Sequence, residues 1–312
     1  MLAAFIKRLF LLVPLVLGIS FLTFTLFALS PSDPAEIAIR VNAMVPTPEL
    51  IAQTRHELGL DLPFFERYWT WLTQCLSGDF GTSFVTRRPV VEEFADALPA
   101  TLNLAFTSLL FLLIVCVPMG MVSALREGEW PDRAVRSIVF FLSAMPAFWL
   151  GILLMSWLAV SWGLLPTSGM RSPLSIVLPT LTLSLAYLPT YVRLIRTEML
   201  TNHHENWVVA AKAWGMPRAH IYWRLLLQSL RGSVTALGMS IPKLIAGAFV
   251  VETLFAWPGI GRLCVSAIFN RDIPIVQTYV LLLAALFVLF NLIADVLVVL
   301  LDPLRRKTGE GL

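Results

Sequence analysis

Charged residues are scarce in this chain. They make up 14% of its 312 residues, whereas hydrophobic residues make up 57% and the mean hydropathy is +0.78. Soluble globular domains contain roughly 25% charged and about 45–50% apolar residues. The composition therefore excludes an ordinary soluble domain and indicates a protein embedded in a lipid bilayer. The formal net charge of +3 gives no reason to expect a nucleic-acid partner.

Histidine and cysteine are also rare, with four and three copies. All four histidines fall in predicted loops, and neither His-Glu-x-x-His nor Gly-x-Ser-x-Gly occurs, so no metal site, cofactor or catalytic centre is predicted. Cys75 and Cys264 would share the external side, but we expect them to stay unpaired, and Cys116 falls inside a hydrophobic stretch.

The sequence has no Gly-Lys pair. An ATPase needs a glycine-rich loop followed by lysine, because backbone N–H groups and the lysine ammonium must surround the phosphates. We therefore expect that this chain is not an enzyme and that any ATP is used by another subunit.

Long apolar runs are what the chain has in abundance. A helix needs about 20 apolar residues to cross the hydrocarbon core. Pro179 and Pro189 interrupt the fourth run, which proline-containing membrane helices tolerate. The first run is too long for a signal-peptide core, so we expect an uncleaved anchor. Six spans are predicted, near Leu9–Leu29, Leu102–Ala124, Ser137–Gly163, Val177–Val192, Val234–Phe255 and Thr278–Leu301.

The basic residues indicate the orientation of these spans. Arg and Lys are concentrated at both termini and in the segments 125–136 and 193–233, and such loops stay in the cytosol. Both termini are thus expected in the cytosol of a multi-pass plasma (inner) membrane protein. Its expected parts are residues 1–30, a tail and first span; residues 31–99, an external loop; and residues 100–312, a core of five spans.

The external loop carries helix signals. Thr47 precedes Pro48 and Glu49, a combination typical of a helix start, and Gly59 ends that run. A second helix, rich in aromatic residues, is predicted from the Asp61-Leu-Pro63 start to Gly78. Aromatic side chains beside a membrane often lie at the level of the headgroups. The loop is either a lid packed on the bundle or a docking platform for an external partner.

The polar segment 197–233 contains two helical runs separated by a turn. Gly215 can adopt positive φ and end the first helix, and Pro217 suits the first turn of the next. Two helices at a fixed bend make a knob that can transmit force to or from a soluble partner. The alternative is a helix that lies on the membrane through Trp207, Val208, Ala211 and Trp214. The candidate coupling residues are Trp207, Ala210, Ala211, Lys212, Gly215, Met216 and Pro217.

Ionisable residues within the spans are candidates for a translocation pathway, because a charge facing lipid costs roughly 2.5–3.5 kcal/mol on insertion scales. The candidates are Lys243, Glu252 and Asp295. Lys243 is near the middle of its span and either lines the pathway or packs in a helix contact. For Asp295 a helix contact or an approach to the cytosolic surface is the simpler interpretation.

Several motifs resemble those of one family. Trp207-Val-Val-Ala-Ala-Lys-Ala-Trp-Gly215 is similar to the "EAA" coupling motif of ABC importer permeases. Residues 251–262, Val-Glu-Thr-Leu-Phe-Ala-Trp-Pro-Gly-Ile-Gly-Arg, resemble a signature of the dipeptide, oligopeptide and nickel permeases. Further similar stretches are Leu58-Gly-Leu-Asp-Leu-Pro63, Gly78-Asp-Phe-Gly81, Arg88-Pro-Val90 and Leu301-Asp-Pro303. The resemblance covers nearly the whole chain.

Within that family, residues 47–49, 68–72 and 265–272 look closest to the nickel-uptake permeases. The motif departs from the family pattern in two places: Val209 and Ala210 stand near its usual acidic start, and Leu225 and Arg231-Gly232 replace its later His and Leu-Pro. These departures predict a coupling surface of slightly different shape, although the Ala-Ala pair and the glycine of the motif persist.

The resemblance implies an all-α permease with six transmembrane helices and the type I ABC importer fold. It also implies a homologous second permease, two cytosolic ATP-binding subunits and an external substrate-binding protein. The expected function is import of nickel, carried as a chelate because no span holds a cluster of metal ligands. A peptide permease of the same architecture is the alternative, and a passive channel or structural membrane subunit is the alternative from another class.

Overall fold

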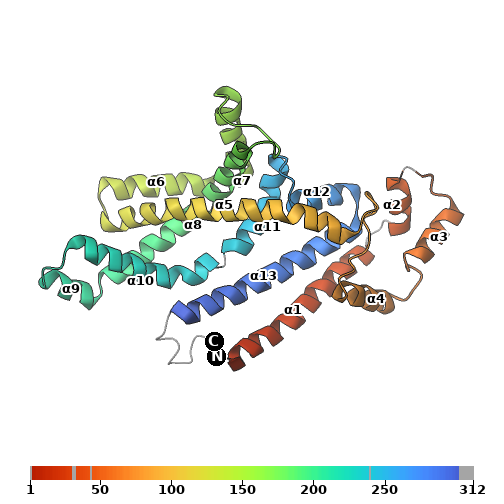
Figure 1. Cartoon of the computed structure of the whole chain (residues 1–312), viewed down its shortest axis with the longest axis horizontal. Coiled ribbons are helices and arrows are strands. Elements are labelled where there is room, and N and C mark those ends of the chain that lie inside the picture. Colours follow the sequence, from red (N-terminus) through yellow and green to blue (C-terminus); the bar gives the residue numbers. More distant parts are fainter. Residues whose placement is uncertain (1, 30–32, 43, 239, 302–312) are drawn as a thin grey trace. The chain divides into compact units, whose positions relative to one another are not determined.

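The computed structural model describes residues 2–29, 33–42, 44–238 and 240–301, and their secondary structure is almost entirely helical (Figure 1). Contacts divide the chain into two compact units. Unit 1 holds residues 1–101 and 258–288, and unit 2 holds residues 102–257 and 289–311. The helices α5 (Val90–Leu125) and α13 (Ile273–Leu301) contribute to both.

Unit 1 contains the two helices that the sequence predicts in the external loop. Thr47 caps α3 (Pro48–Glu57) by accepting a hydrogen bond from the Leu50 amide at 3.3 Å, and Gly59 follows with φ 65°. The aromatic helix is α4 (Phe64–Leu76), and Gly78 after it has φ 86°. Both predicted helices are confirmed, because the signals that start and end them are local in sequence.

Two further helices of unit 1 were not predicted. The helix α2 (Pro34–Val41) begins with Asp33, whose carboxylate accepts from the Ala35 amide at 3.0 Å, so the Asp-Pro pair was a usable start signal. The other is α12 (Ile260–Asn270). At the junction of α12 and α13, Asp272 is buried and accepts from the Ser83 hydroxyl and, at 3.0 Å, from the Phe84 amide. This carboxylate ties the segment before α5 to the start of α13.

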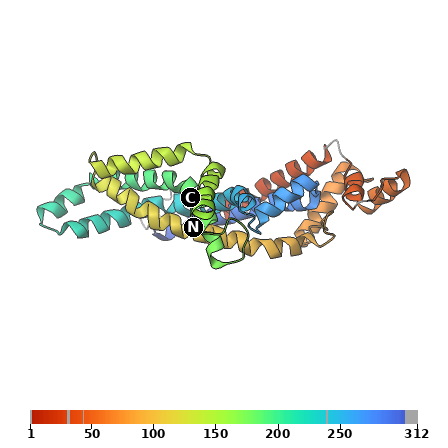
Figure 2. The ribbon, with the colours of Figure 1, turned by 90° about the horizontal axis from the view of Figure 1, so that it is seen from above.

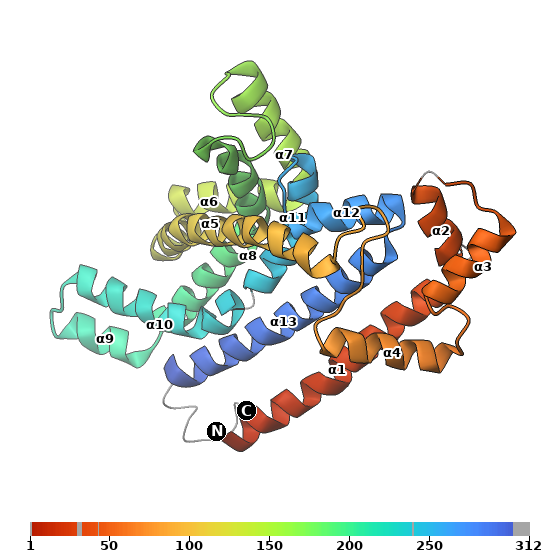
Figure 3. The ribbon, with the colours of Figure 1, turned by 45° about the vertical axis from the view of Figure 1, so that its right-hand side comes forward.

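The aromatic helix α4 packs on the first helix, α1 (Leu2–Ala28), as Figure 3 shows. The Tyr68 hydroxyl shares a hydrogen bond of 2.8 Å with Ser20, and the Phe24 ring centroid lies within 5.6 Å of the Phe64, Tyr68 and Trp71 ring centroids. This packing supports the lid interpretation for that face. Elsewhere on α4, Phe65 and Trp69 remain largely exposed.

Unit 2 is organised around α8 (Val177–His203), which contacts most of the other helices of this unit. It contacts α6 (Trp130–Ala144), α7 (Ala147–Leu154), α10 (Arg218–Gly238), α11 (Ser240–Leu254) and a 3₁₀ helix, Pro173–Ile176. The unit also contains α9 (Asn206–Ala213) and a π-helix, Met155–Ser161. Glycine allows α5 to approach α8 closely, since a Cβ on Gly120 would lie 2.8 Å from the Ile195 Cβ. Small residues at crossings are typical of membrane helix packing.

By length and composition, three helical segments of the described chain can cross a membrane: α5, the 3₁₀ helix together with α8 (Pro173–His203), and part of α13. A fourth span results if the bent pair of α6 and α7 counts as one. The third predicted span, 137–163, is wrong as a single helix, because α6 and α7 meet at 106° (Figure 1). Pro146 lacks an amide N–H and keeps Met145 extended at ψ 126°. The fifth predicted span, Val234–Phe255, begins inside α10 and continues as α11.

Candidate coupling surface and its ionic brace

The predicted turn between two helices is confirmed. The helix α9 ends in a Schellman motif: Gly215 has φ 72° and donates to the Lys212 carbonyl at 3.1 Å, and the Met216 amide donates to the Ala211 carbonyl at 3.0 Å. Pro217 lies just before α10 instead of in its first turn, because its carbonyl accepts the Ile221 amide at 3.2 Å. Figures 1 and 2 show α9 and α10 projecting together at one end of unit 2.

The inner side of α9 is buried within the chain. Val208 and Ala211 are buried in the same core as Ile195 and Met199 of α8 and Ile221 of α10, and the coupling candidates Trp207 and Met216 pack against this core. The apolar side chains that would face lipid in the membrane-lying alternative are therefore mostly used in packing between helices.

The outer side of α9 is exposed and partly apolar. Trp214 is 83% exposed and Val209 is 64% exposed, and Lys212 and Gly215 are exposed beside them, while Ala210 is half-buried. The predicted face made of Trp207, Val208, Ala211 and Trp214 is thus wrong, because Trp214 is exposed whereas Val208 and Ala211 are buried. An exposed tryptophan next to a fixed turn is typical of an anchor for a partner, since tryptophan is enriched among the residues that dominate binding energy.

Polar contacts join the start of α9 and the end of α8 to α10. The Gln228 amide of α10 donates to the Glu205 carboxylate at 3.0 Å, directly before α9. The Asn202 amide of α8 donates to the Ser229 hydroxyl of α10 at 3.1 Å. The helices α8, α9 and α10 are therefore joined through polar contacts as well as through their apolar core.

A buried carboxylate braces the neighbouring end of unit 2. Asp132 in the first turn of α6 is 1% exposed. It accepts hydrogen bonds from the Ser123 hydroxyl of α5 at 2.6 Å, the Gly128 amide at 3.0 Å, and Arg196 of α8 through Nε at 3.0 Å and Nη2 at 3.2 Å. Arg196 also lies 3.5 Å from a Glu127 carboxylate oxygen. One side chain thus holds α5, α6 and α8 together.

The ionic brace, Asp132 with Arg196, was not predicted from the sequence. Arg196 contributed to the sequence analysis only as one of the basic residues of segment 193–233, which indicated the orientation, and Asp132 was given no role. The available signal was weak: an acidic residue in the first turn of a helix that starts with Trp130-Pro131. Arg196 lies two turns before His203 at the end of α8, about 10 Å along the axis. The ionic brace is therefore close, along the same helix, to the polar segment 197–233 that holds the candidate coupling residues.

The pathway candidates do not share one face. On α11, Lys243 is exposed and its carbonyl accepts the Tyr187 hydroxyl at 2.8 Å, whereas Glu252 is fully buried. The side chain of Asp295 lies outside the described part of the structure. Among the described residues, no group of three or more His, Cys, Asp or Glu side chains is arranged to hold a metal ion, and all three cysteines are free.

Comparison with known proteins matches both halves of the chain to one class. Residues 116–307 match the model for "Binding-protein-dependent transport system inner membrane component", and residues 1–105 match its N-terminal counterpart. The metal-staphylopine import system permease protein CntB of Staphylococcus aureus is 37% identical over 97% of each chain. The glutathione transport system permease protein GsiC of Escherichia coli is 36% identical, over 96% of this chain and 98% of its own.

Solved structures show the same fold at lower identity. Two inward-facing crystal forms of the MetNI methionine ABC transporter each contain a chain whose fold is similar to this one, with TM-scores of 0.57 and 0.59 for the two comparisons. Each match is 19–20% identical and covers 67% of this chain and 96% of the other. At this identity the likeness establishes the fold alone.

Proposed function

We propose that this chain, which belongs to the family of binding-protein-dependent transport system inner membrane components and is the permease subunit of an ABC importer, carries nickel as a chelate. Members of this family are multi-pass permease subunits of the inner membrane and are not the catalytic subunits. Membership of this family argues against a passive channel, which was the alternative from another class in the sequence analysis.

The mechanism that we propose is alternating access driven from the α9 surface. One observation carries it: α9 is buried on its inner side against α8 and α10 and exposes Trp214 and Val209 on its outer side. A cytosolic ATP-binding subunit that holds Trp214 would move α8, α9 and α10 together. This assignment requires the 197–233 segment and both termini in the cytosol, with two ATP-binding subunits, a homologous second permease and an external binding protein as partners.

The chelate is favoured over a bare ion by the chemistry of the described side chains. A naked Ni²⁺ ion needs several nitrogen, sulfur or oxygen ligands to replace its water, and the described residues offer no group of three His, Cys, Asp or Glu side chains. A chelate brings its own ligands, so the permease need only provide a wide and mildly polar path. The similarity to a metal-staphylopine permease supports a complexed metal as cargo.

Peptide import is the second candidate, and a nearly equal identity to a glutathione permease favours it. Deleting the gene and measuring cellular nickel under metal limitation, together with growth on a peptide as the sole amino-acid source, separates the two. Loss of nickel that a plasmid copy restores supports the chelate. Normal nickel with lost growth on the peptide selects peptide import instead.

A further inference from the structure

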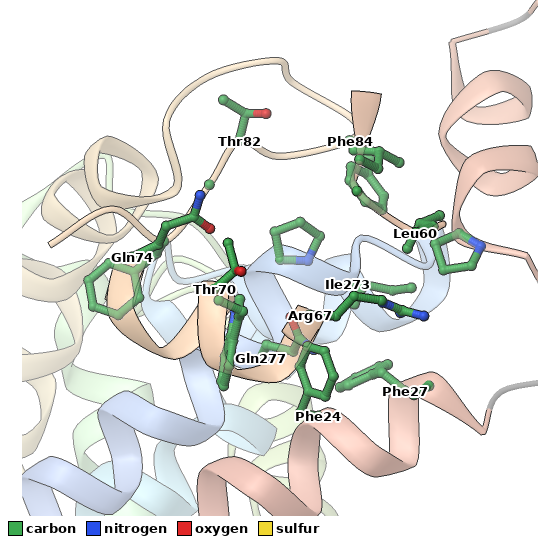
Figure 4. A pocket seen from close by; sticks show the side chains of 18 of the residues that line it. Phe24, Phe27, Leu60, Arg67, Thr70, Gln74, Thr82, Phe84, Ile273 and Gln277 are labelled. Carbon is green, nitrogen blue, oxygen red and sulfur yellow. The ribbon is translucent and has the colours of Figure 1, made fainter. Parts of the chain in front are cut away.

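Unit 1 contains a cavity of about 430 Å³ that the proposed transport mechanism does not use. Figure 4 shows side chains converging on it from α1, α4, the 79–84 segment and the start of α13. Phe24, Phe27 and Trp71 give it an aromatic wall. Small-molecule sites are typically about 300–1,000 Å³, largely apolar and provided with a few polar groups. The size and lining of this cavity match that description.

Two of the less exposed polar side chains that line the cavity have no side-chain hydrogen-bond or ion-pair partner among the described residues. Gln277 of α13 is only 7% exposed, yet its side-chain amide makes no hydrogen bond to any described residue. Arg67 of α4 is half-buried, and its guanidinium forms neither an ion pair nor a hydrogen bond within the described chain; the guanidinium carbon lies 5.8 Å from the centroid of the Phe24 ring. Neither side-chain amide atom of Gln277 is among the buried polar atoms of the described chain that lack a hydrogen-bond partner, so both are open to solvent and available to a bound polar ligand.

The same cavity also carries negative charge. Glu57 and Asp79 line it, and both are exposed to solvent. Glu57 accepts from Gln53 and Asp79 accepts from the Gly81 amide, but neither carboxylate has an ion-pair partner among the described residues. One unpaired cation and two unpaired carboxylates therefore surround an aromatic-walled space. Such a lining favours a ligand that carries both charges over a phosphate, which the carboxylates would repel.

We propose that this cavity binds a zwitterionic compound derived from amino acids, of the size of a dipeptide. Its carboxylate lies against the Arg67 guanidinium and accepts from the Gln277 amide. Its ammonium faces Glu57 and Asp79, and its apolar side chain packs on Phe24 and Trp71. The site rests on unit 1 alone and holds whether the importer carries a chelate or a peptide.

The test uses the complete importer, both permeases with their ATP-binding subunits, in nanodiscs of neutral phosphatidylcholine without the binding protein. Calorimetric titration with alanyl-phenylalanine should show saturable binding. Blocking its C-terminus as an amide, or its N-terminus by acetylation, should weaken binding about tenfold or more, because hydrogen bonds to charged groups are lost. Arg67→Met should weaken it equally, and Gln277→Leu several-fold. Arg67→Lys should retain part of the affinity.

Arg40→Met is the matched control, since Arg40 is exposed on α2, pairs with Glu36 at 2.6 Å and does not line the cavity. Its affinity should equal that of the parent. If Arg67→Met does not assemble, the blocked dipeptides on the unchanged complex decide the question. Absence of binding up to about 10 mM, or equal binding by parent and Arg67→Met, overturns the proposal. Retention of phosphatidylglycerol by the parent and not by Arg67→Met, without dipeptide binding, assigns the cavity to a lipid headgroup instead.

Discussion

Asp132→Asn should uncouple ATP hydrolysis from transport while leaving the chain in the membrane. The substitution preserves the shape of the side chain but replaces the carboxylate, whose two oxygens accept four hydrogen bonds at 2.6–3.2 Å, with a neutral amide. An amide has one acceptor oxygen, and its NH₂ group would face N–H or O–H donors. Removing one partner of a buried ion pair costs about 3–5 kcal/mol. Because Arg196 is 20% exposed and keeps Glu127 nearby, we expect the lower end, about 3 kcal/mol.

The stability effect is best measured as a double-mutant cycle. Asp132→Asn, Arg196→Gln and the double variant are unfolded reversibly in mixed detergent micelles, and the interaction energy should be about 2 kcal/mol. The matched control is Arg136→Gln. Arg136 is 58% exposed and 3.7 Å from the same carboxylate, and exposed pairs contribute little.

The transport effect is measured on the reconstituted importer as substrate moved per ATP hydrolysed. This ratio should fall for Asp132→Asn and Arg196→Gln and stay unchanged for Arg136→Gln. A normal ratio in Asp132→Asn, or an interaction energy near zero, would refute the idea that this carboxylate joins α5, α6 and α8 mechanically.

Three further outcomes are expected. At Gly215 no heavy atom lies within 4 Å of the place that a Cβ would take, so only the positive φ of 72° disfavours a side chain there. Uptake and pull-down of the ATP-binding subunit should therefore decrease from Gly215→Asn to Gly215→Ala to Gly215→Val, because the left-handed conformation costs an ordinary residue about 1–2 kcal/mol. Equal activity of Gly215→Val and Gly215→Asn would contradict this. The purified chain alone should release no phosphate from ATP. Robust hydrolysis by it would contradict the assignment of ATP hydrolysis to a separate subunit. Cys116→Ala should leave nickel uptake intact, because we expect no residue of this chain to hold the metal; loss of uptake with normal assembly would point to a direct ligand.

The features that the sequence predicted correctly are those whose cause is local. The caps of α3 and α9 depend on residues within one turn of each other, such as Thr47 with Leu50 and Gly215 with Lys212. Their residue types alone therefore identify them. The bend at Pro146 was also local, yet an apolar count over 137–163 hid it, because hydropathy does not register a missing amide N–H.

The features that the sequence could not predict depend on distant residues. Asp132 and Arg196 are far apart in the chain, and each alone resembles a charge at the membrane surface. The cavity of unit 1 is assembled from Phe24, Arg67 and Gln277, which three different helices supply. Such sites follow from tertiary packing, for which a single sequence carries no periodic signal.

The packing of unit 2 determines which helices would move together if a partner displaced α9 at Trp214. A displacement of α9 would be transmitted to α8 through the buried contacts of Val208 and Ala211, because a close-packed core has low compressibility. The close approach of Gly120 to Ile195 then couples α8 to α5, and the Asp132 carboxylate adds α6. Since both the apolar and the ionic contacts join the same helices, the end of unit 2 near α9 should move as one body. The softer element is then the 106° junction of α6 and α7, where no helical hydrogen-bond ladder bridges Pro146.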